Sequence, residues 1–278
     1  SETIQRVEDL YRPYRPKRRT RATIAKEKGL EGLANTILAQ ELQIGELEGE
    51  ALSYINEEKE VHTVEEALAG AMDIIAEIIS DNAEYREIIR KTAYQRGIIE
   101  TEGVEEEKKS VYEMYYDYKE PIKSIANHRV LAINRGEKEK ALKVNLVLPD
   151  EDIILKLKSL IISNPKSDSK TYLEEAIEDS YKRLIFPSIE REIRSGLTER
   201  AEEEAIKVFA FNLKPLLMQS PIKGKVVMGI DPGFRTGCKV AIVDETGKYL
   251  ESAVVYPTEP QNQVEKTKVE LAKLIGKH

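Results

Sequence analysis

Apolar residues recur at helical spacing over most of the chain. This periodicity is the strongest constraint that the sequence places on the fold. Thr63 and Glu66 form the pattern of a capping box, which marks a helix start. The apolar residues behind it form one stripe: Val64, Ala67, Leu68, Ala71, Ile75, Ile78 and Ile79. Their spacing places them on one helix face. Charged residues make up 33% of the sequence, above the usual quarter or so, which suits long solvated helix faces. The sequence therefore predicts a mostly α-helical fold.

The same periodicity continues beyond this stripe, with one interruption. Further helices are expected to begin near Asp81, Asp150, Thr171 and Thr198. In the last of these, which runs towards Gln219, the residues expected to face inward are Ala205, Ile206, Phe209, Leu213 and Leu216. Leu142 to Leu148 alternates as a strand does, which predicts a small β element near residues 141–148. The stretch from Arg129 to Arg135 is compatible with either a strand or a helix.

The N-terminal segment combines prolines, tyrosines and clustered cations. Tyr11-Arg12-Pro13-Tyr14-Arg15-Pro16 disfavours a helix, because proline lacks an N–H and drives the preceding residue towards extended geometry. We expect an extended arm that leads into a short helix ending near Gly29. The formal net charge is −7, but local fields decide where a polyanion binds. The candidate phosphate-binding residues are Arg12, Arg15, Lys17, Arg18, Arg19 and Arg21.

Two interpretations of this arm stay open. In the first, its guanidinium groups bind phosphates while Tyr11 and Tyr14 stack on bases. In the second, the tyrosines and prolines pack into a helix junction, and the arginines pair with acidic helices of the same chain.

The sequence changes character after Ser220–Gly224, so we expect a helical region over residues 1–221 and a second domain over residues 224–278. Strands are predicted at 225–230, 239–243 and 249–256, followed by a helix over 261–275. Asp231 ends the first strand, and Gly233 and Gly237 follow. In RNase H-like folds a carboxylate at this place can bind a divalent cation together with further carboxylates. Alternatively, the Asp231 side chain caps a turn.

Several stretches resemble the bacterial Tex family of transcription accessory proteins: Tyr11–Ala25, His128–Glu139, Glu203–Phe209 and Val226–Ala241. The resemblance covers nearly the whole chain. It implies a protein that binds RNA and DNA, with a helical region that contains a helix-turn-helix-like part, followed by a YqgF-type α/β RNase H-like domain that lacks a complete catalytic set. This sequence stops after the first helix of that domain, before the family's helix-hairpin-helix and S1 modules, so the domain is expected to be truncated.

Three classes of function are compatible with this pattern. The resemblance favours a non-catalytic, nucleic-acid-binding scaffold in transcription. The alternatives are a metal-dependent nuclease of the Holliday-junction-resolvase type, with Asp231 as its first metal ligand, and an ATPase of the actin and sugar-kinase group. Both alternatives need residues beyond His278, so we expect no enzyme activity, with Asp231 as a vestigial candidate only. The expected partners are RNA or single- or double-stranded DNA, the transcription machinery, and a second copy through an exposed sheet edge.

Neither a cofactor nor a metal site is expected. The three histidines lie far apart in the sequence, without cysteine or carboxylate at zinc-ligand spacing. The single cysteine, Cys238, excludes an internal disulfide and fits a reducing, cytoplasmic setting. No apolar run approaches the roughly 20 residues that span a membrane. Four tyrosines stand at helical spacing and are expected to pack at the edge of a helical bundle, with a platform for base stacking as the alternative: Tyr112, Tyr115, Tyr116 and Tyr118.

Overall fold

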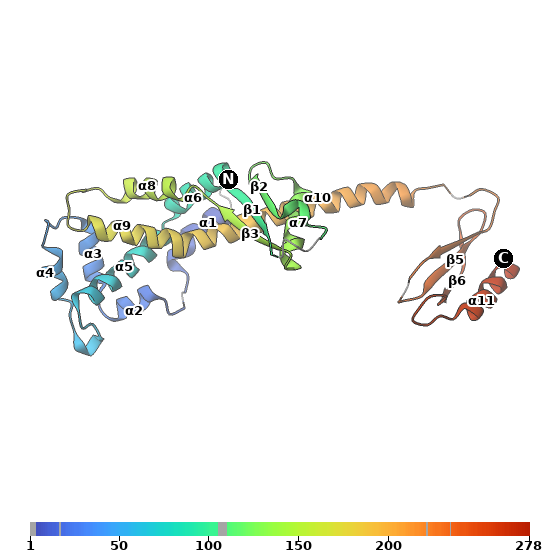
Figure 1. Ribbon diagram of the computed structural model, residues 1–278, viewed down its shortest axis with the longest axis horizontal. Helices are drawn as coiled ribbons and strands as arrows, with labels where there is room; N and C mark the ends of the chain where they lie inside the picture. Colours follow the sequence, from blue (N-terminus) through green and yellow to red (C-terminus); the bar gives the residue numbers. More distant parts are fainter. Residues whose placement is uncertain (1–3, 17, 105–109, 221, 234) are drawn as a thin grey trace. The chain divides into compact units, whose positions relative to one another are not determined.

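The structure is a computed structural model that describes residues 4–16, 18–104, 110–220, 222–233 and 235–278. The chain divides into two compact units, residues 1–206 and residues 207–278. Most described residues lie in helices, and each unit contains one three-stranded antiparallel sheet (Figure 1). The expected fold class, a mostly helical region followed by an α/β region, is confirmed.

The N-terminal helices begin with a feature that differs from the predicted extended arm. Helix α1 (Ile4–Tyr11) runs directly into a 3₁₀ turn at Arg12–Tyr14. Pro13 fits this turn because the first residues of a helix need no N–H donor. The backbone becomes extended only at Arg15. The prediction of an extended arm is therefore wrong for its first half.

Helices α2 (Arg21–Glu27) and α3 (Glu31–Ala39) form a short helix-turn-helix-like pair. Thr20 caps α2 in a reciprocal box with Thr23, which satisfies backbone donors at the helix start. Gly29 has a φ of +83°, a left-handed conformation that glycine adopts without steric cost. Helix α4 (Leu47–Leu52) follows.

Helix α5 (Val64–Asp81) is the centre of the helical unit, and α2, α3 and α9 (Lys170–Asp179) pack against it. The predicted apolar stripe is largely buried, although Ile78 is exposed. Helix α6 (Ala83–Arg96) follows directly, with Asn82 as its cap. Helix α8 (Asp150–Ile161) precedes α9. A π-helical segment (Ser180–Ile185) joins α9 to α10 (Phe186–Leu217).

The first sheet has the order β2-β1-β3, with β1 (Ile98–Gly103) between β2 (Asp117–Pro121) and β3 (Leu142–Val147). Helix α7 (Asn127–Lys138) packs against β3 and contains the stretch that the sequence left ambiguous. Tyr112 and Tyr115 are buried in the shared core. The tyrosines therefore pack as expected, but Tyr115 ends a short 3₁₀ helix (Glu113–Tyr115) and Tyr118 lies on β2, so the group does not follow one α-helix.

The C-terminal half of α10 contradicts the predicted inward stripe. Ala201 is the last buried residue of α10, and the described residues after it on this helix are all exposed. Ile206, Phe209 and Leu216 lie on this exposed part. The stripe has helical spacing, but among the described residues it has no surface to pack against.

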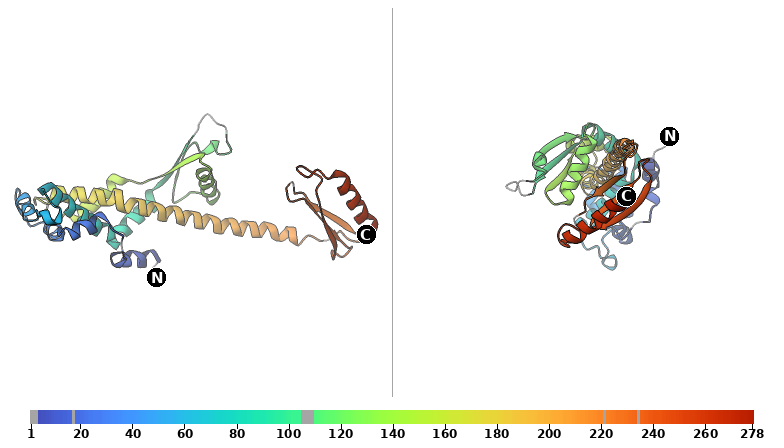
Figure 2. Two further views of the ribbon diagram at one scale, coloured as in Figure 1. Left: turned by 90° about the horizontal axis from the view of Figure 1, so that it is seen from below. Right: turned by 90° about the vertical axis from the view of Figure 1, so that its right-hand side faces the viewer.

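The second unit contains β4 (Val227–Asp231), β5 (Cys238–Val243), β6 (Tyr249–Val255) and helix α11 (Val264–Lys277). The strands pair antiparallel in the order β4-β5-β6, and α11 lies along one face of the sheet (Figure 2). The core is small and consists of Cys238, Val240, Ile242, Val255 and Leu274. No helix among the described residues has both the length and the apolar composition to cross a bilayer.

Candidate nucleic-acid interface

The structure places the predicted phosphate-binding cations on the surface next to α1, α2 and α5. We call residues 12–21 the basic segment. Arg12 lies in the 3₁₀ turn, and its Nε donates to Asp81 Oδ1 over 3.2 Å. Arg15 and Arg18 are exposed, and neither side chain has a hydrogen-bond or ion-pair partner among the described residues. Lys17 lies outside the described residues.

The other two cations of the basic segment stand nearer to acidic groups. Arg19 Nη2 lies 3.5 Å from Glu27 Oε2, and both side chains are largely exposed. Arg21 is the first residue of α2. Burial raises the pKa of Asp73, and the positive charges of Arg183 and Arg21 oppose that rise. Of the five cations of the basic segment that the structure describes, two have no carboxylate partner among the described residues and three lie close to one.

Tyr11 precedes the 3₁₀ turn and Tyr14 ends it, and both residues are exposed. Their exposed fractions are 57% and 78%, so neither ring is packed in a helix junction. The packing interpretation of the arm is thus wrong for the tyrosines, and it holds among the arginines most clearly for Arg12 and Asp81. Two exposed rings remain beside the exposed guanidinium groups.

The helix-turn-helix-like pair does not itself present cations on its second helix. In helix-turn-helix proteins the second helix enters the major groove and reads base edges. Here the exposed residues of α3 are Glu31, Gly32, Asn35 and Ala39. The positive charge lies before and within α2, a location suited to contacts with a phosphate backbone.

Arg15 lines two clefts, both within the helical unit. The smaller has a volume of about 540 Å³ and lies between the basic segment and the end of α5. The larger, of about 660 Å³, lies between α1, α6 and α10. We call the larger one the arginine cleft, because its wall carries Arg12, Arg15, Arg86, Arg90 and Arg191.

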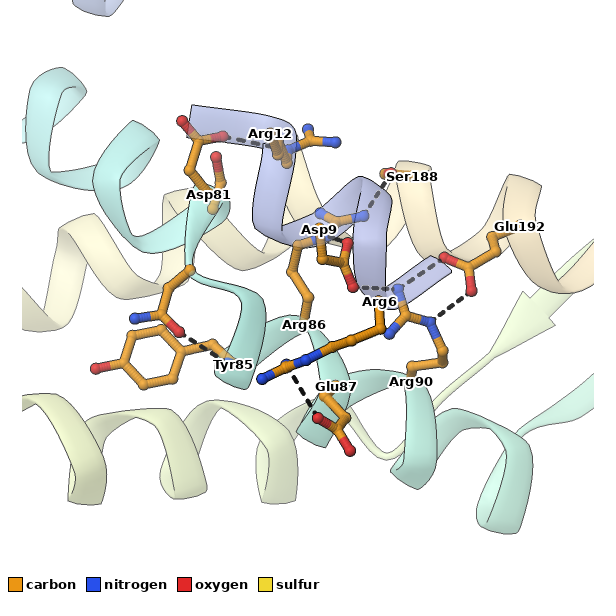
Figure 3. A network of polar contacts seen from close by, with 12 residues as sticks. Arg6, Asp9, Arg12, Asp81, Tyr85, Arg86, Glu87, Arg90, Ser188 and Glu192 are labelled. Carbon is orange, nitrogen blue, oxygen red and sulfur yellow. Dashed lines mark hydrogen bonds and ion pairs between the residues drawn. The ribbon is translucent and has the colours of Figure 1, made fainter. Parts of the chain in front are cut away.

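A buried network of charges forms the floor of the arginine cleft (Figure 3). Asp9 of α1 accepts from Arg86 Nε through Oδ1 and from Arg90 Nη2 through Oδ2, both over 2.7 Å. Arg86 Nη2 donates to Ser188 Oγ over 2.9 Å, and Arg90 also binds Glu192. Three helices far apart in the sequence are therefore joined by charge-assisted hydrogen bonds.

Sequence reasoning did not find this network. The only signal was the spacing of Arg86 and Arg90, which places them one turn apart on one face of α6. Their partner Asp9 lies 77 and 81 residues away in the sequence. A pairing at such a separation follows from the packing of α1 against α6, which local patterns do not specify.

Asp231 lies at the exposed end of β4, directly across from Lys239 of β5. The loop that follows is tight, since a Cβ atom on Gly233 would come within 2.5 Å of the carbonyl oxygen of Gly237. Gly237 itself has a φ of +83°. Within the described ranges, no three histidine, cysteine or acidic side chains gather so that they could hold a metal ion. A two-metal site at Asp231 therefore does not fit the described residues.

Comparison with known proteins agrees with this architecture. Residues 45–209 match the family described as Tex central region-like, and residues 225–278 match the Tex protein YqgF-like domain. The chain is 51% identical to Uncharacterized protein YdcI of Bacillus subtilis, over 99% of this chain and 38% of that protein. It is 38% identical to Protein tex of Bordetella pertussis, over 100% of this chain and 37% of that protein.

A third relative, Transcriptional accessory protein Tex of Neisseria gonorrhoeae, is 36% identical over 98% of this chain and 36% of that protein. The chain thus spans little more than a third of the length of these relatives. The central-region match takes in more than half of the chain, and the YqgF-like match covers the whole second sheet and its helix. The protein accordingly belongs to the Tex family.

Proposed function

We propose that this chain binds RNA or DNA through its basic segment and acts as a non-catalytic part of a transcription accessory protein. The observation that carries the proposal is the state of Arg15 and Arg18. Both are exposed, and neither side chain has an acidic partner among the described residues. Their charge is therefore available to a ligand, whereas the charge of Arg12 is largely committed to Asp81.

The chemistry of the segment suits a nucleic-acid backbone. Guanidinium groups bind phosphate oxygens in a fork geometry and stay charged at physiological pH. The exposed rings of Tyr11 and Tyr14 offer stacking surfaces that tolerate any base. Because α3 presents no cation on its exposed face, we expect binding with little sequence preference.

A salt titration tests the proposal. The logarithm of the affinity for a single-stranded oligonucleotide should fall linearly with the logarithm of salt concentration, since bound cations release counterions. The double variant Arg15→Gln and Arg18→Gln should reduce the slope by roughly 1.4, about 0.7 for each phosphate that the variant no longer neutralises. Fluorescence anisotropy with labelled RNA and DNA measures both quantities.

The matched control is the double variant Arg96→Gln and Arg135→Gln. It removes the same amount of charge at two arginines outside the basic segment, Arg96, which pairs with Asp152, and Arg135, which pairs with Glu139. We expect it to leave the slope unchanged. Equal slopes for the wild type and the Arg15 and Arg18 variant would show that the basic segment does not contact the nucleic acid.

The non-catalytic part of the proposal has its own test. Asp231 is exposed beside Lys239, and the described residues supply no cluster of metal-binding groups. We expect no strand cleavage when the purified chain is incubated with magnesium and single-stranded or branched DNA. Magnesium-dependent cleavage that disappears in Asp231→Asn would establish the nuclease alternative instead.

A further inference from the structure

Arg86 has an unusual position at the floor of the arginine cleft. Its side chain is only 3% exposed, and it lines the cleft wall. Its Nε and Nη2 donate to Asp9 and Ser188. Its Nη1 is buried and has no hydrogen-bond partner among the described residues. A buried donor without an acceptor is costly, and more so on a charged group.

The carboxylates nearest to Arg86 accept from other donor atoms and not from its Nη1. Both oxygens of Asp9 are already bound, one by Arg86 and one by Arg90. Both oxygens of Glu192 are bound by Arg90. The remaining acidic side chains of the cleft, Glu8 and Glu199, are exposed.

Further guanidinium groups stand around the same space. Burial is the main cause that lowers the pKa of Arg86, and the nearby positive charge of Arg12 is the second. Arg15 and Arg191 line the cleft, are exposed, and have no side-chain ion pair among the described residues. Two adjacent guanidinium groups repel each other unless an anion lies between them.

We propose that the arginine cleft is a binding site for a phosphate group, held between Arg86, Arg12 and Arg15. Nη1 is covered by its neighbours, so a phosphate oxygen would supply its missing acceptor once those side chains move aside, and the dianion would offset the repulsion between Arg12 and Arg86. Phosphate suits this arrangement because it accepts hydrogen bonds from several arginines at once. The volume of about 660 Å³ leaves room for the group that carries the phosphate.

The phosphate could belong to a nucleic-acid backbone or to a small molecule. The site itself stands on Arg86 and its surroundings, whereas the nucleic-acid source rests on the proposed function. Isothermal titration calorimetry of the 278-residue chain with inorganic phosphate, at constant ionic strength in chloride, tests the site. Competition between inorganic phosphate and an unlabelled oligonucleotide tests the source.

We expect the wild type to bind inorganic phosphate, and Arg15→Gln and Arg86→Lys each to weaken that binding about tenfold or more, since each loses a charge-assisted hydrogen bond. Arg15→Gln carries the test if Arg86→Lys fails to fold, because Arg15 is exposed. Arg135→Gln, an exposed arginine paired with Glu139, is the control and should bind as the wild type does.

The outcomes separate this inference from the proposed function. No phosphate binding by the wild type, or full binding by Arg15→Gln, would overturn the site. If Arg18→Gln still reduces the salt dependence of oligonucleotide binding relative to the wild type, the proposed nucleic-acid binding stands even when the phosphate site is refuted. Phosphate binding that an oligonucleotide fails to displace would support the site and assign its phosphate to a small molecule.

Discussion

Asp9 is a single carboxylate that holds two arginines of α6 at once. It is nearly fully buried, and so is Arg86, so both charges have lost most of their hydration. Such a pair contributes little net stability compared with an apolar substitute, but removing one partner leaves the other charge uncompensated. Asp9 therefore matters less for the energy of its own bonds than for the cost of its absence.

The replacement Asp9→Asn should accordingly destabilise the helical unit by about 3 kcal/mol or more, since Arg86 stays buried without a counter-charge. The matched control is Glu27→Gln, which removes an exposed partner of Arg19 and should cost within about 0.5 kcal/mol. Urea denaturation followed by far-ultraviolet circular dichroism measures both. Equal midpoints for the two variants would contradict a buried, interdependent network.

At the scale of an element, the π-helical segment between α9 and α10 positions Tyr181. The widened turn places this ring in the core, where its hydroxyl donates to Asp150 Oδ1 over 2.5 Å. Burial is the main cause that raises the pKa of Tyr181, and the bond to Asp150 adds to it. π-helical turns are rare and persist where the surrounding packing requires them.

This environment predicts a specific dependence of stability on pH. An unfolded tyrosine ionises near pH 10, whereas the folded state keeps Tyr181 protonated to higher pH. Stability linked to this group is therefore complete below about pH 10 and is lost as pH rises above it. The variant Tyr181→Phe should be less stable than the wild type at neutral pH by about 1 kcal/mol, through the lost hydrogen bond.

The difference between wild type and Tyr181→Phe should shrink as pH rises past 10, which urea denaturation at a series of pH values can follow. The variant Tyr14→Phe is the control, because Tyr14 is 78% exposed. It should follow the wild type at every pH. A constant difference across the series would show that Tyr181 ionises as it does in the unfolded chain.

Elements differ in how far the sequence could predict them, for physical reasons. The stripe of α5 was predictable because one long helix buries a full face. The strands after residue 224 were predictable because each is a short apolar run between turn residues. Strands β1 and β2 were missed: β2 is a charged edge strand that exists through its register with β1, not through its own propensity.

The candidate site shows the same division. Sequence reasoning found which cations cluster, because clustering is local. Which of them remain without a partner depends on contacts such as Arg12 with Asp81, 69 residues apart, and these are set by helix packing. The arginine cleft could not be predicted from the sequence for the same reason, because helix packing brings its residues together.

The loop between β4 and β5 offers a further test at this scale. Gly237 has a φ of +83°, and a Cβ atom there would come within 2.6 Å of the Tyr256 ring. Gly237→Ala should destabilise the second unit by more than about 1 kcal/mol through backbone strain and steric overlap. Gly276→Ala on α11 meets open space and should be neutral or stabilising by up to about 1 kcal/mol. Hydrogen exchange of the β5 amides reports both effects, and equal protection in the two variants would refute the role of Gly237.

At the scale of the whole molecule, charge and binding have to be considered together. The chain carries a formal net charge of −7, which repels nucleic acid at long range, while the basic segment attracts it locally. At 0.1 M salt, interactions between exposed charges more than about 10 Å apart are largely screened. The proposed interface therefore depends on a few local contacts.

The sheet of the second unit has two edge strands, β4 and β6. Strand β4 pairs with β5 on one side, and no described strand pairs with its other side. Ile230 on this strand is 53% exposed. Open edges with apolar side chains are templates for pairing with another chain, so we predict that two copies of this chain associate through β4. The resulting dimer would pair the free backbone N–H and C=O groups of two edge strands.

Sedimentation velocity over a wide range of protein concentrations should show a mass that rises with concentration for the wild type. A lysine on an edge strand opposes such pairing, because it places like charges in the new sheet. Ile230→Lys should therefore remain a monomer. Ile44→Lys, at an 84% exposed position in the helical unit, adds the same charge elsewhere and should associate as the wild type does. A wild type that stays monomeric, or an Ile230→Lys variant that associates equally well, would show that the open edge of β4 is not a contact between copies.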